Sequence, residues 1–211
     1  MLIALFGPPG VGKGTQAVML VKNLHLKHIS TGDILRAAMK SRTHAGELAR
    51  EYVTAGRLVP GKIVRELAED AMTEAKIDKI VLDGYPRTIE QAEWLDEFLA
   101  SHGKELDSVI SIRVPDERIV NRLSKRRINA ETGETYHLDF KPPPRDLDPA
   151  LVVQRKDDLP SAIRARLKVY RKQTKPLELY FANQSKLKLL DGVGSIDEVH
   201  ERLVEHLQVF S

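Results

Sequence analysis

GPPGVGKGT occupies residues 7–15, directly after the apolar run LIALF at residues 2–6. The stretch closely matches the loop G-x-x-x-x-G-K-[S/T], in which backbone N–H groups and a lysine surround phosphate oxygens. The glycines and the lysine are in place, but Gly14 follows the lysine and the hydroxyl group comes one position later, at Thr15. The apolar run is typical of a buried strand, and apolar residues at helical spacing follow the loop. We therefore predict that residues 7–15 bind nucleotide phosphate.

Apolar runs of strand length recur along the chain and alternate with helical patterns. The predicted strands are residues 2–6, 28–30, 80–82, 109–114 and 187–190. The predicted helices are residues 63–74, 90–100, 117–127 and 162–183, with one more after Ser195, where Ser195 and Glu198 form a capping-box pattern. This alternation predicts an α/β fold of three layers, in which helices cover both faces of a five-stranded parallel sheet.

Two segments interrupt the alternation. Residues 31–59 have helical patterns with no strand between them. Residues 128–158 lack a clear periodicity and contain three consecutive prolines at 142–144. Loops of this length are commonly lids or binding loops, and apolar residues such as Tyr136 and Phe140 favour a small mobile insert over a disordered linker. The predicted organisation is therefore a core with two inserts; the core comprises residues 1–30, 60–127 and 159–211.

The composition is typical of a soluble globular protein. Of 211 residues, 42% are hydrophobic and 30% are charged. No apolar run is long enough to span a bilayer, and no secretory signal pattern is visible, so we expect a cytoplasmic protein with no membrane partner. The absence of cysteine excludes disulfides and thiol catalysis. The net charge of +3 is spread among many acidic residues, which does not favour a nucleic-acid partner.

Two stretches near the middle of the chain also suit phosphate chemistry. The predicted strand IVLD ends in Asp83. In phosphate-loop proteins such an aspartate lies beside the loop and holds Mg²⁺, usually through water, although alone it could equally cap a turn. GYPRT follows, so Arg87 leaves the carboxyl end of a strand, where ligands bind in open α/β sheets. Its guanidinium matches the geometry of phosphate, although a solitary arginine is usually a surface residue.

Motifs along nearly the whole chain resemble those of the adenylate kinases, a family of nucleoside monophosphate kinases. The matching stretches are GPPGVGKGTQA, STGDILRAA, GRLVP, VLDGYPRTIEQA, VPDERIVNRLSKRR, TGETYH and QRKDD with RARL after it. The resemblance implies a monomer that reversibly transfers a phosphoryl group from Mg·ATP to AMP, giving two ADP, in adenine nucleotide homeostasis and purine salvage. It also implies that residues 31–59 form the AMP-binding insert and residues 128–158 the lid.

The resemblance further implies roles for particular residues. Those at the ATP phosphates would be Gly10, Val11, Gly12, Lys13, Gly14, Thr15 and Arg126. Those elsewhere on ATP would be Arg122 and Gly194 at the adenine, and the lid backbone at Thr135 and Tyr136. Those at AMP would be Thr31, Arg36, Arg57, Leu58, Val59, Gly84, Tyr85, Pro86, Arg87 and Gln91, with Arg155 and Arg166 clamping the reacting phosphates. The catalytic groups would be Lys13, Arg87, Arg126, Arg155 and Arg166.

The chemistry of phosphoryl transfer agrees with these roles. The reaction requires that two anionic substrates be brought together and that developing charge be stabilised. Several guanidinium groups are needed in one cleft, and they come from separated segments: Arg36, Arg87, Arg126, Arg155 and Arg166. No general-base histidine is required, and we expect His137 to be structural.

Two of the assigned residues have plausible structural roles instead. Gln91 could complete a capping box by accepting from the backbone N–H of Thr88, which would compete with reading of the adenine edge. Thr31 could cap the helix that follows it, although its hydroxyl can serve two partners. Thr31 together with a long lid favours AMP over UMP or CMP, because the short-lid UMP/CMP kinases tend to have alanine there. GTP remains an alternative donor, and a non-catalytic nucleotide-binding protein remains an alternative class.

The metal sites of this chain are expected to differ from those of some relatives. Some long-lid family members bind zinc through four cysteines, whereas this chain has none and no His/Asp set replaces them, so we expect no structural zinc. Side chains of the lid could form a hydrogen-bonded substitute: Asn129, Thr132, Asp146 and Asp148. Because Gly14 offers no hydroxyl, Mg²⁺ should be held by phosphate oxygens and waters, with Asp83 acting through water and Thr15 serving phosphate.

Overall fold

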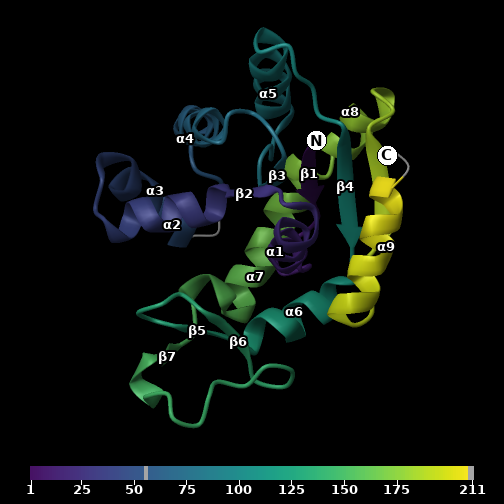
Figure 1. Cartoon of the computed structure of the whole chain (residues 1–211). Coiled ribbons are helices and arrows are strands. Elements are labelled where there is room, and N and C mark those ends of the chain that lie inside the picture. Colours follow the sequence, from purple (N-terminus) through teal and green to yellow (C-terminus); the bar gives the residue numbers. More distant parts are fainter. Residues whose placement is uncertain (55–56, 209–211) are drawn as a thin grey trace.

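A five-stranded parallel sheet forms the centre of the computed structural model, which describes residues 1–54 and 57–208 (Figure 1). In spatial order its strands are β2 (Lys27–Ser30), β3 (Ile80–Asp83), β1 (Leu2–Phe6), β4 (Ser108–Arg113) and β8 (Leu187–Asp191). Ala4 in the central strand pairs with Leu82 on one side and Val109 on the other. All five residues of β1 are buried, as its continuous apolar sequence predicts. The predicted α/β class and five-stranded parallel sheet are confirmed.

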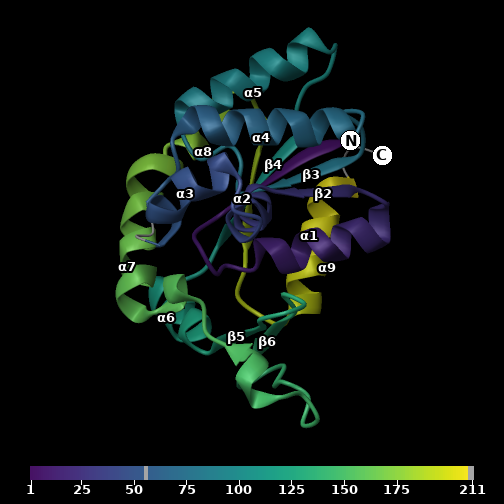
Figure 2. The ribbon, with the colours of Figure 1, turned by 90° about the vertical axis from the view of Figure 1, so that its left-hand side faces the viewer.

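Helices cover both faces of this sheet (Figure 2). On one face lie α4 (Gly61–Glu74), α5 (Ile89–Ser101) and α8 (Leu177–Asn183), packed against alternate strand residues such as Leu2 and Phe6. On the other face, α1 (Lys13–Leu24) and α9 (Ile196–Gln208) pack against Ile3 and Leu5. The Ser195–Glu198 capping box at the start of α9 is present. No helix within residues 1–54 and 57–208 is long and apolar enough to cross a membrane.

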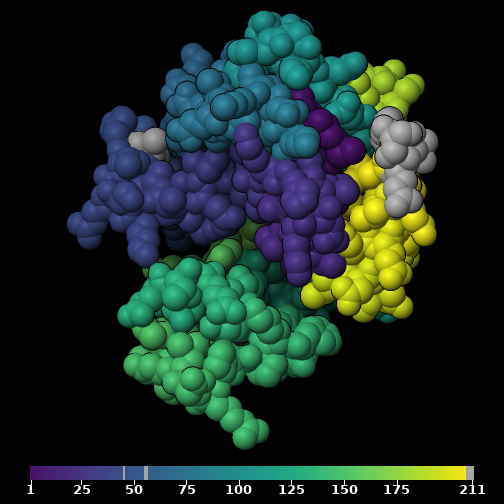
Figure 3. Space-filling model, viewed as in Figure 1, coloured from purple at the N-terminus to yellow at the C-terminus, as the bar shows by residue number. Residues whose placement is uncertain are grey.

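The elements of the two segments that interrupt the alternation extend away from the central sheet (Figures 1 and 3). The first contains helices α2 (Thr31–Lys40) and α3 (His44–Thr54), which pack against each other. The second contains a small antiparallel sheet of three strands: β5 (Arg126–Asn129), β6 (Thr135–His137) and β7 (Val152–Val153). Helices α6 (Asp116–Ser124) and α7 (Pro160–Val169) lead into and out of the second insert and pack together through Leu123 and Ile163.

Two predicted helices are shorter than their patterns indicate: one stops early and the other is interrupted. The helix predicted over residues 117–127 stops at Ser124, because Arg126 already pairs with His137 in the three-stranded sheet. The helix predicted over residues 162–183 is interrupted by a π-helical turn at Tyr170–Thr174, in which Lys175 N–H donates to the carbonyl of Tyr170. Pro176 lacks an N–H group and so cannot continue the helical ladder. Tertiary strand pairing and proline chemistry therefore override the local helical periodicity.

Candidate active site

The phosphate loop lies between β1 and α1, with helix α6 packed against it. Gly10 has φ +78°, and a Cβ added there would lie 2.4 Å from Cγ of Leu123 in α6. A Cβ on Gly12 would lie 3.6 Å from Nη1 of Arg122, also in α6. Gly12 begins α1 without a side chain to cap it, so the first N–H groups of the helix remain available for an anion. The close packing therefore places Arg122 directly beside an anion-binding loop.

Lys13 turns back into the loop. Its Nζ donates to the carbonyl oxygens of Gly7 at 2.8 Å and Pro8 at 3.0 Å. Burial lowers the pKa of Lys13 from 10.5 to about 8; Asp83 opposes this shift, and Arg87 and Arg166 add to it. The lysine is therefore a partly desolvated cation within reach of the arginines assigned to AMP.

Asp83 lies against the start of α1, as its place at the end of β3 predicts. A Cβ on Gly14 would lie 3.3 Å from Oδ2 of Asp83, so the glycine leaves room for this carboxylate beside the loop. His28 of the neighbouring strand places Nε2 3.6 Å from the same oxygen. No sequence motif indicated that His28 lies beside Asp83. The two residues come together because β2 and β3 pair in parallel. Within the described residues, no group of three or more His, Cys, Asp or Glu side chains could hold a metal ion.

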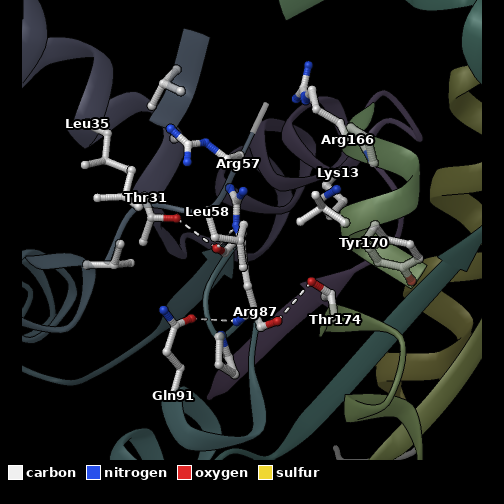
Figure 4. Close-up of a pocket in the computed structure, with 18 of the residues that line it drawn as sticks. Lys13, Thr31, Leu35, Arg57, Leu58, Arg87, Gln91, Arg166, Tyr170 and Thr174 are labelled. Atoms are coloured by element: carbon white, nitrogen blue, oxygen red, sulfur yellow. Dashed lines mark hydrogen bonds between the residues drawn. The ribbon is translucent and has the colours of Figure 1, made fainter. Parts of the chain in front are cut away.

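A pocket opens beside the loop, at the carboxyl ends of β1 and β3 (Figure 4). It brings together most of the residues assigned to AMP from the resemblance, and Lys13 as well: Lys13, Thr31, Arg36, Arg57, Leu58, Val59, Gly84, Pro86, Arg87, Gln91 and Arg166. Tyr85 does not line it, because the side chain is fully buried in the core and burial raises its pKa. Only the backbone of Tyr85 is therefore in a position to serve this pocket.

Some residues of the pocket were not identified from the sequence. They include Leu35, Val53, Val64, Asp157, Val169, Tyr170 and Thr174. The apolar members follow the same helical spacing as core residues, so the sequence offers no signal that separates them from the core. Tyr170 and Thr174 belong to the π-helical turn, which the helical periodicity did not indicate.

Thr31 faces the pocket and does not cap its helix. Its Oγ1 donates to the carbonyl of Gly84 at 2.9 Å, and the side chain is almost fully buried. The cap of α2 is Ser30, whose Oγ accepts from the backbone N–H of Asp33 at 3.2 Å. The alternative role of Thr31 as a helix cap is therefore wrong, and its hydroxyl oxygen retains the capacity to accept a hydrogen bond.

Gln91 also differs from the expected capping arrangement. Thr88 caps α5 by accepting from the backbone N–H of Gln91 at 3.3 Å, as predicted. The side-chain oxygen of Gln91, however, accepts from the backbone N–H of Arg87 at 2.8 Å, one residue before the expected partner Thr88. Arg87 is further held by a bond from its Nε to the carbonyl of Gly84 at 2.7 Å. Burial, followed by the charge of Arg166, lowers the pKa of Arg87 to about 10.

Two aspartates hold Arg126 and Arg166. Arg126 forms a two-pronged pair with Asp158, at 2.8 Å from Nε and 2.7 Å from Nη2. Arg166 places Nη1 2.9 Å from the carboxylate of Asp157 and 3.8 Å from that of Asp158. Asp158 is fully buried, so its negative charge is balanced by both cationic neighbours and not by water. The sequence analysis gave these aspartates no role. Their adjacent positions in the motif QRKDD were a signal that could have indicated one.

Arg155 lies next to this pair but outside the lining of the pocket. Its Nε is buried and has no hydrogen-bond partner among the described residues. Burial, together with the charges of Arg126 and Arg36, lowers its pKa to about 10. The arginines predicted to gather are thus close enough to influence one another, and Arg155 retains unused donor capacity.

The small three-stranded sheet is stabilised around Tyr136 and not by the polar set that was expected. Tyr136 is buried, and its hydroxyl donates to Glu134 at 3.1 Å, while Lys141 donates to the same carboxylate at 2.8 Å. His137 stacks on Phe140, with ring centroids 4.5 Å apart, in agreement with a structural role. In the described part of the chain, the four expected residues do not form one cluster; for example, Asn129 and Asp148 accept from backbone N–H groups of their own turns.

The remaining residues assigned to ATP lie around the loop and in the lid. Thr135 is exposed at the start of β6. Gly194 lies between β8 and α9 with φ +134°, and a Cβ there would lie 2.7 Å from Glu198 and 2.8 Å from Arg202. The positive φ favours glycine at this turn, and the residue is exposed, so its backbone stays accessible.

The fold and the site together define a phosphate-loop phosphotransferase with a cation-lined pocket beside the loop. Comparison with known proteins specifies which one: residues 5–186 match the family model described as adenylate kinase, and the chain belongs to that family. It is 54% identical to an adenylate kinase of Salinibacter ruber, with 98% of each chain covered. It is 45% identical to one of Carboxydothermus hydrogenoformans, with 99% of this chain and 100% of that one covered. The protein is therefore a phosphotransferase that acts on ATP and AMP.

Proposed function

We propose that Lys13 and the arginines of the cleft carry out the transfer ATP + AMP ⇌ 2 ADP, with Mg²⁺, in adenine nucleotide homeostasis. The observation that carries these roles is the position of the pocket, which shares Lys13 with the phosphate loop and is lined by Arg87 and Arg166. A donor phosphate on the loop and an acceptor phosphate in the pocket would meet at these cations. Holding reactants in this way supplies a large part of the catalysis of phosphoryl transfer.

On the ATP side, the loop residues from Gly10 to Thr15 would surround the phosphates. Arg122 would pack against the adenine, as its position beside Gly12 supports. Gly194 would offer its backbone to the same base, and the backbone of Thr135 and Tyr136 would approach ATP from the lid. Arg126 would reach the transferred phosphate after exchanging Asp158 for the substrate.

On the AMP side, the pocket would hold the base and the phosphate at different ends. Gln91 and Thr31 would contact the base, with the backbone at Leu58, Val59 and Gly84 close by. Cations would hold the phosphate: Arg36, Arg57, Arg87, Arg155 and Arg166. Tyr85 and Pro86 would contribute by shaping the turn that presents Arg87.

The metal ion would be held mainly by phosphate oxygens and waters. Asp83 is the carboxylate beside the loop, and its closeness to Gly14 supports a role through water. Thr15 would donate to phosphate, since the position that usually supplies a metal-binding hydroxyl is occupied by glycine. When bound, the ion would supply positive charge against the charge that develops on the phosphates.

We also propose the division into a core and two moving inserts, with closing segments at residues 31–59 and 128–158. The first boundary is supported by α2, which starts at Thr31. The second lies within β5, which begins at Arg126, so the moving part would include the strand that carries this arginine. Closure would exclude water, which otherwise competes with AMP for the phosphoryl group.

A crystal structure with a bisubstrate analogue and Mg²⁺ would test these roles together. We expect guanidinium groups of Arg87, Arg126, Arg155 and Arg166 on phosphate oxygens, and Asp83 separated from the metal by water. Arginines that stayed on Asp157 and Asp158 would contradict the assigned roles. Thr15 Oγ1 bound directly to Mg²⁺ would contradict the metal assignment.

The lowered pKa of Lys13 leads to a pH-dependence prediction. Above pH about 8 the buried amine loses its proton in the free enzyme, so kcat/KM for ATP should fall as pH rises through 8. The unfolded chain keeps that proton up to about 10.5, so it binds more protons between these values, and the contribution of Lys13 to the free energy of unfolding rises with pH across this window. The pH profile of kcat/KM and urea titrations above and below pH 8 measure the two effects.

The matched control is Lys13→Met, which removes the titrating group. Its free energy of unfolding should rise less steeply between pH 8 and 10.5 than that of the wild type. Equal slopes for the two proteins, or a flat ATP profile up to pH 10 in the wild type, would show that Lys13 titrates at its ordinary pKa.

A further inference from the structure

The π-helical turn at Tyr170–Thr174 directs one polar side chain away from solvent. Thr174 is 8% exposed, whereas the three residues before it are exposed. A threonine hydroxyl within a helix commonly donates to the carbonyl four residues before it. The Oγ1 of Thr174 instead donates to the backbone carbonyl of Arg87 at 2.9 Å (Figure 4). This hydroxyl therefore joins the segment that follows α7 to the turn that precedes α5.

The π turn also determines which way Thr174 faces. Arg166, Tyr170 and Thr174 are spaced four residues apart, and all three line the pocket (Figure 4). In a continuous α-helix each residue advances by about 100°, so a residue eight positions further on faces about 80° away from the first. The π turn, closed by the bond from Lys175 N–H to the carbonyl of Tyr170, takes one more residue per turn. It therefore brings Thr174 back toward the face that carries Arg166.

The carbonyl that accepts this bond belongs to a residue whose other polar groups are held as well. The backbone N–H of Arg87 donates to Oε1 of Gln91 at 2.8 Å, and its Nε donates to the carbonyl of Gly84 at 2.7 Å. The N–H fixes the peptide before Arg87, and the carbonyl fixes the peptide after it. Together these two bonds determine the direction of the Cα–Cβ bond. Because the guanidinium lies at the end of a long side chain, a small rotation of the backbone would move it appreciably.

We propose that Thr174 is a positioning residue, whose hydroxyl fixes the backbone carbonyl of Arg87 and thereby aims the Arg87 guanidinium at the acceptor phosphate. This inference rests on the proposed function, in which Arg87 holds the phosphate of AMP. The hydroxyl acts through Arg87 and needs no contact with the substrate. Since Thr174 continues the helical segment of Arg166, the same bond keeps the two guanidinium groups in a fixed relation. Such positioning matters because a misplacement of about 1 Å can cost about a hundredfold in rate.

The variant Thr174→Val tests this directly, because valine has nearly the same shape and lacks the hydroxyl. With ATP saturating, we expect kcat/KM for AMP to fall by about tenfold, while the KM for ATP stays within about twofold of the wild type. Thr174→Ser keeps the hydroxyl and should restore kcat/KM for AMP to within about threefold of the wild type. The matched control is Gln173→Ala, an exposed neighbour in the same turn, which should change neither constant.

A double variant separates positioning from a loss of stability. Thr174→Val leaves the carbonyl of Arg87 without this donor, so urea titration should show a lower free energy of unfolding whether or not Arg87 keeps its side chain. The kinetic effect should depend on that side chain, because Arg87→Ala leaves no guanidinium to aim. The double variant Arg87→Ala, Thr174→Val should therefore match Arg87→Ala in kcat/KM for AMP within about twofold. A purely structural role would instead add a second loss of about tenfold.

The outcomes distinguish this inference from the proposed function. Arg87→Ala is measured first, and near-normal kcat/KM for AMP in that variant would refute the proposed role of Arg87 and the inference with it. Once a large loss in Arg87→Ala is established, an unchanged kcat/KM for AMP in Thr174→Val would overturn the inference alone. Equal losses in Thr174→Val and Thr174→Ser, or additive losses in the double variant, would also overturn it. If Thr174→Val does not fold, Thr174→Ala replaces it, and equal kcat/KM for AMP in Thr174→Ala and Thr174→Ser would overturn the inference.

Discussion

Arg126→Ala should lower kcat by at least about a hundredfold, because it removes a guanidinium that would stabilise charge on the transferred phosphate. Arg126 is suited to this role by its place at the start of β5, where the lid strand leaves α6 beside the phosphate loop. Steady-state kinetics with both substrates saturating measures the effect. Near-normal kcat in a folded Arg126→Ala protein would contradict the role assigned to this arginine.

Arg126→Ala should also reduce stability, which the control must separate from catalysis. The carboxylate of Asp158 is fully buried, and without Arg126 its nearest remaining cation is Arg166 at 3.8 Å. Removing one partner of a buried ion pair typically costs about 3–5 kcal/mol. The double variant Arg126→Ala, Asp158→Asn removes the unpaired charge, so its free energy of unfolding should recover while kcat stays low. If kcat recovered together with stability, the loss in the single variant would be structural.

Arg87→Ala should lower kcat/KM for AMP by about a thousandfold while the KM for ATP changes little. Its guanidinium is held in the pocket proposed for AMP by the carbonyl of Gly84, away from the loop residues that would hold ATP. The loss in stability should be small, because Gly84 keeps the hydrogen bond from Thr31. Kinetics with AMP varied at saturating ATP, and then the reverse, measures the two effects separately.

The matched control for this loss of charge is Arg164→Ala. Arg164 is an exposed arginine of α7, on the same helix as Arg166. Its removal should leave kcat/KM for AMP within about twofold of the wild type, since surface charges contribute little beyond the screening distance. Equal losses in Arg87→Ala and Arg164→Ala would indicate a general effect of charge and not a specific phosphate contact.

Local motifs account for the parts of this structure that the sequence predicted. The glycine loop follows a strand whose residues are all apolar, so strand, turn and helix are each encoded within a few residues. The arginines that we propose as catalytic could be identified because each lies in a motif that resembles those of the family. Their positions relative to one another depend on the fold, which brings Arg87 and Arg166 together in the pocket beside Lys13.

The features that the sequence did not predict depend on contacts between distant segments. The partner of Gln91 is Arg87 and not Thr88, because the turn before α5 presents the earlier N–H to the side chain. Thr174 reaches Arg87 across 87 residues, from a π-helical turn that has no recognisable periodicity. Asp158 acquires its importance from complete burial, which no motif specifies. Such contacts follow from packing, and local patterns do not report them.

The central claim is that the phosphate loop and the pocket beside it transfer a phosphoryl group from ATP to AMP. The most direct test measures ADP formation with ATP and each of AMP, UMP and CMP as acceptor, using the purified protein. The account predicts the highest kcat/KM with AMP. Faster turnover of UMP or CMP than of AMP, or a folded ATP-binding protein that forms no ADP, would contradict it.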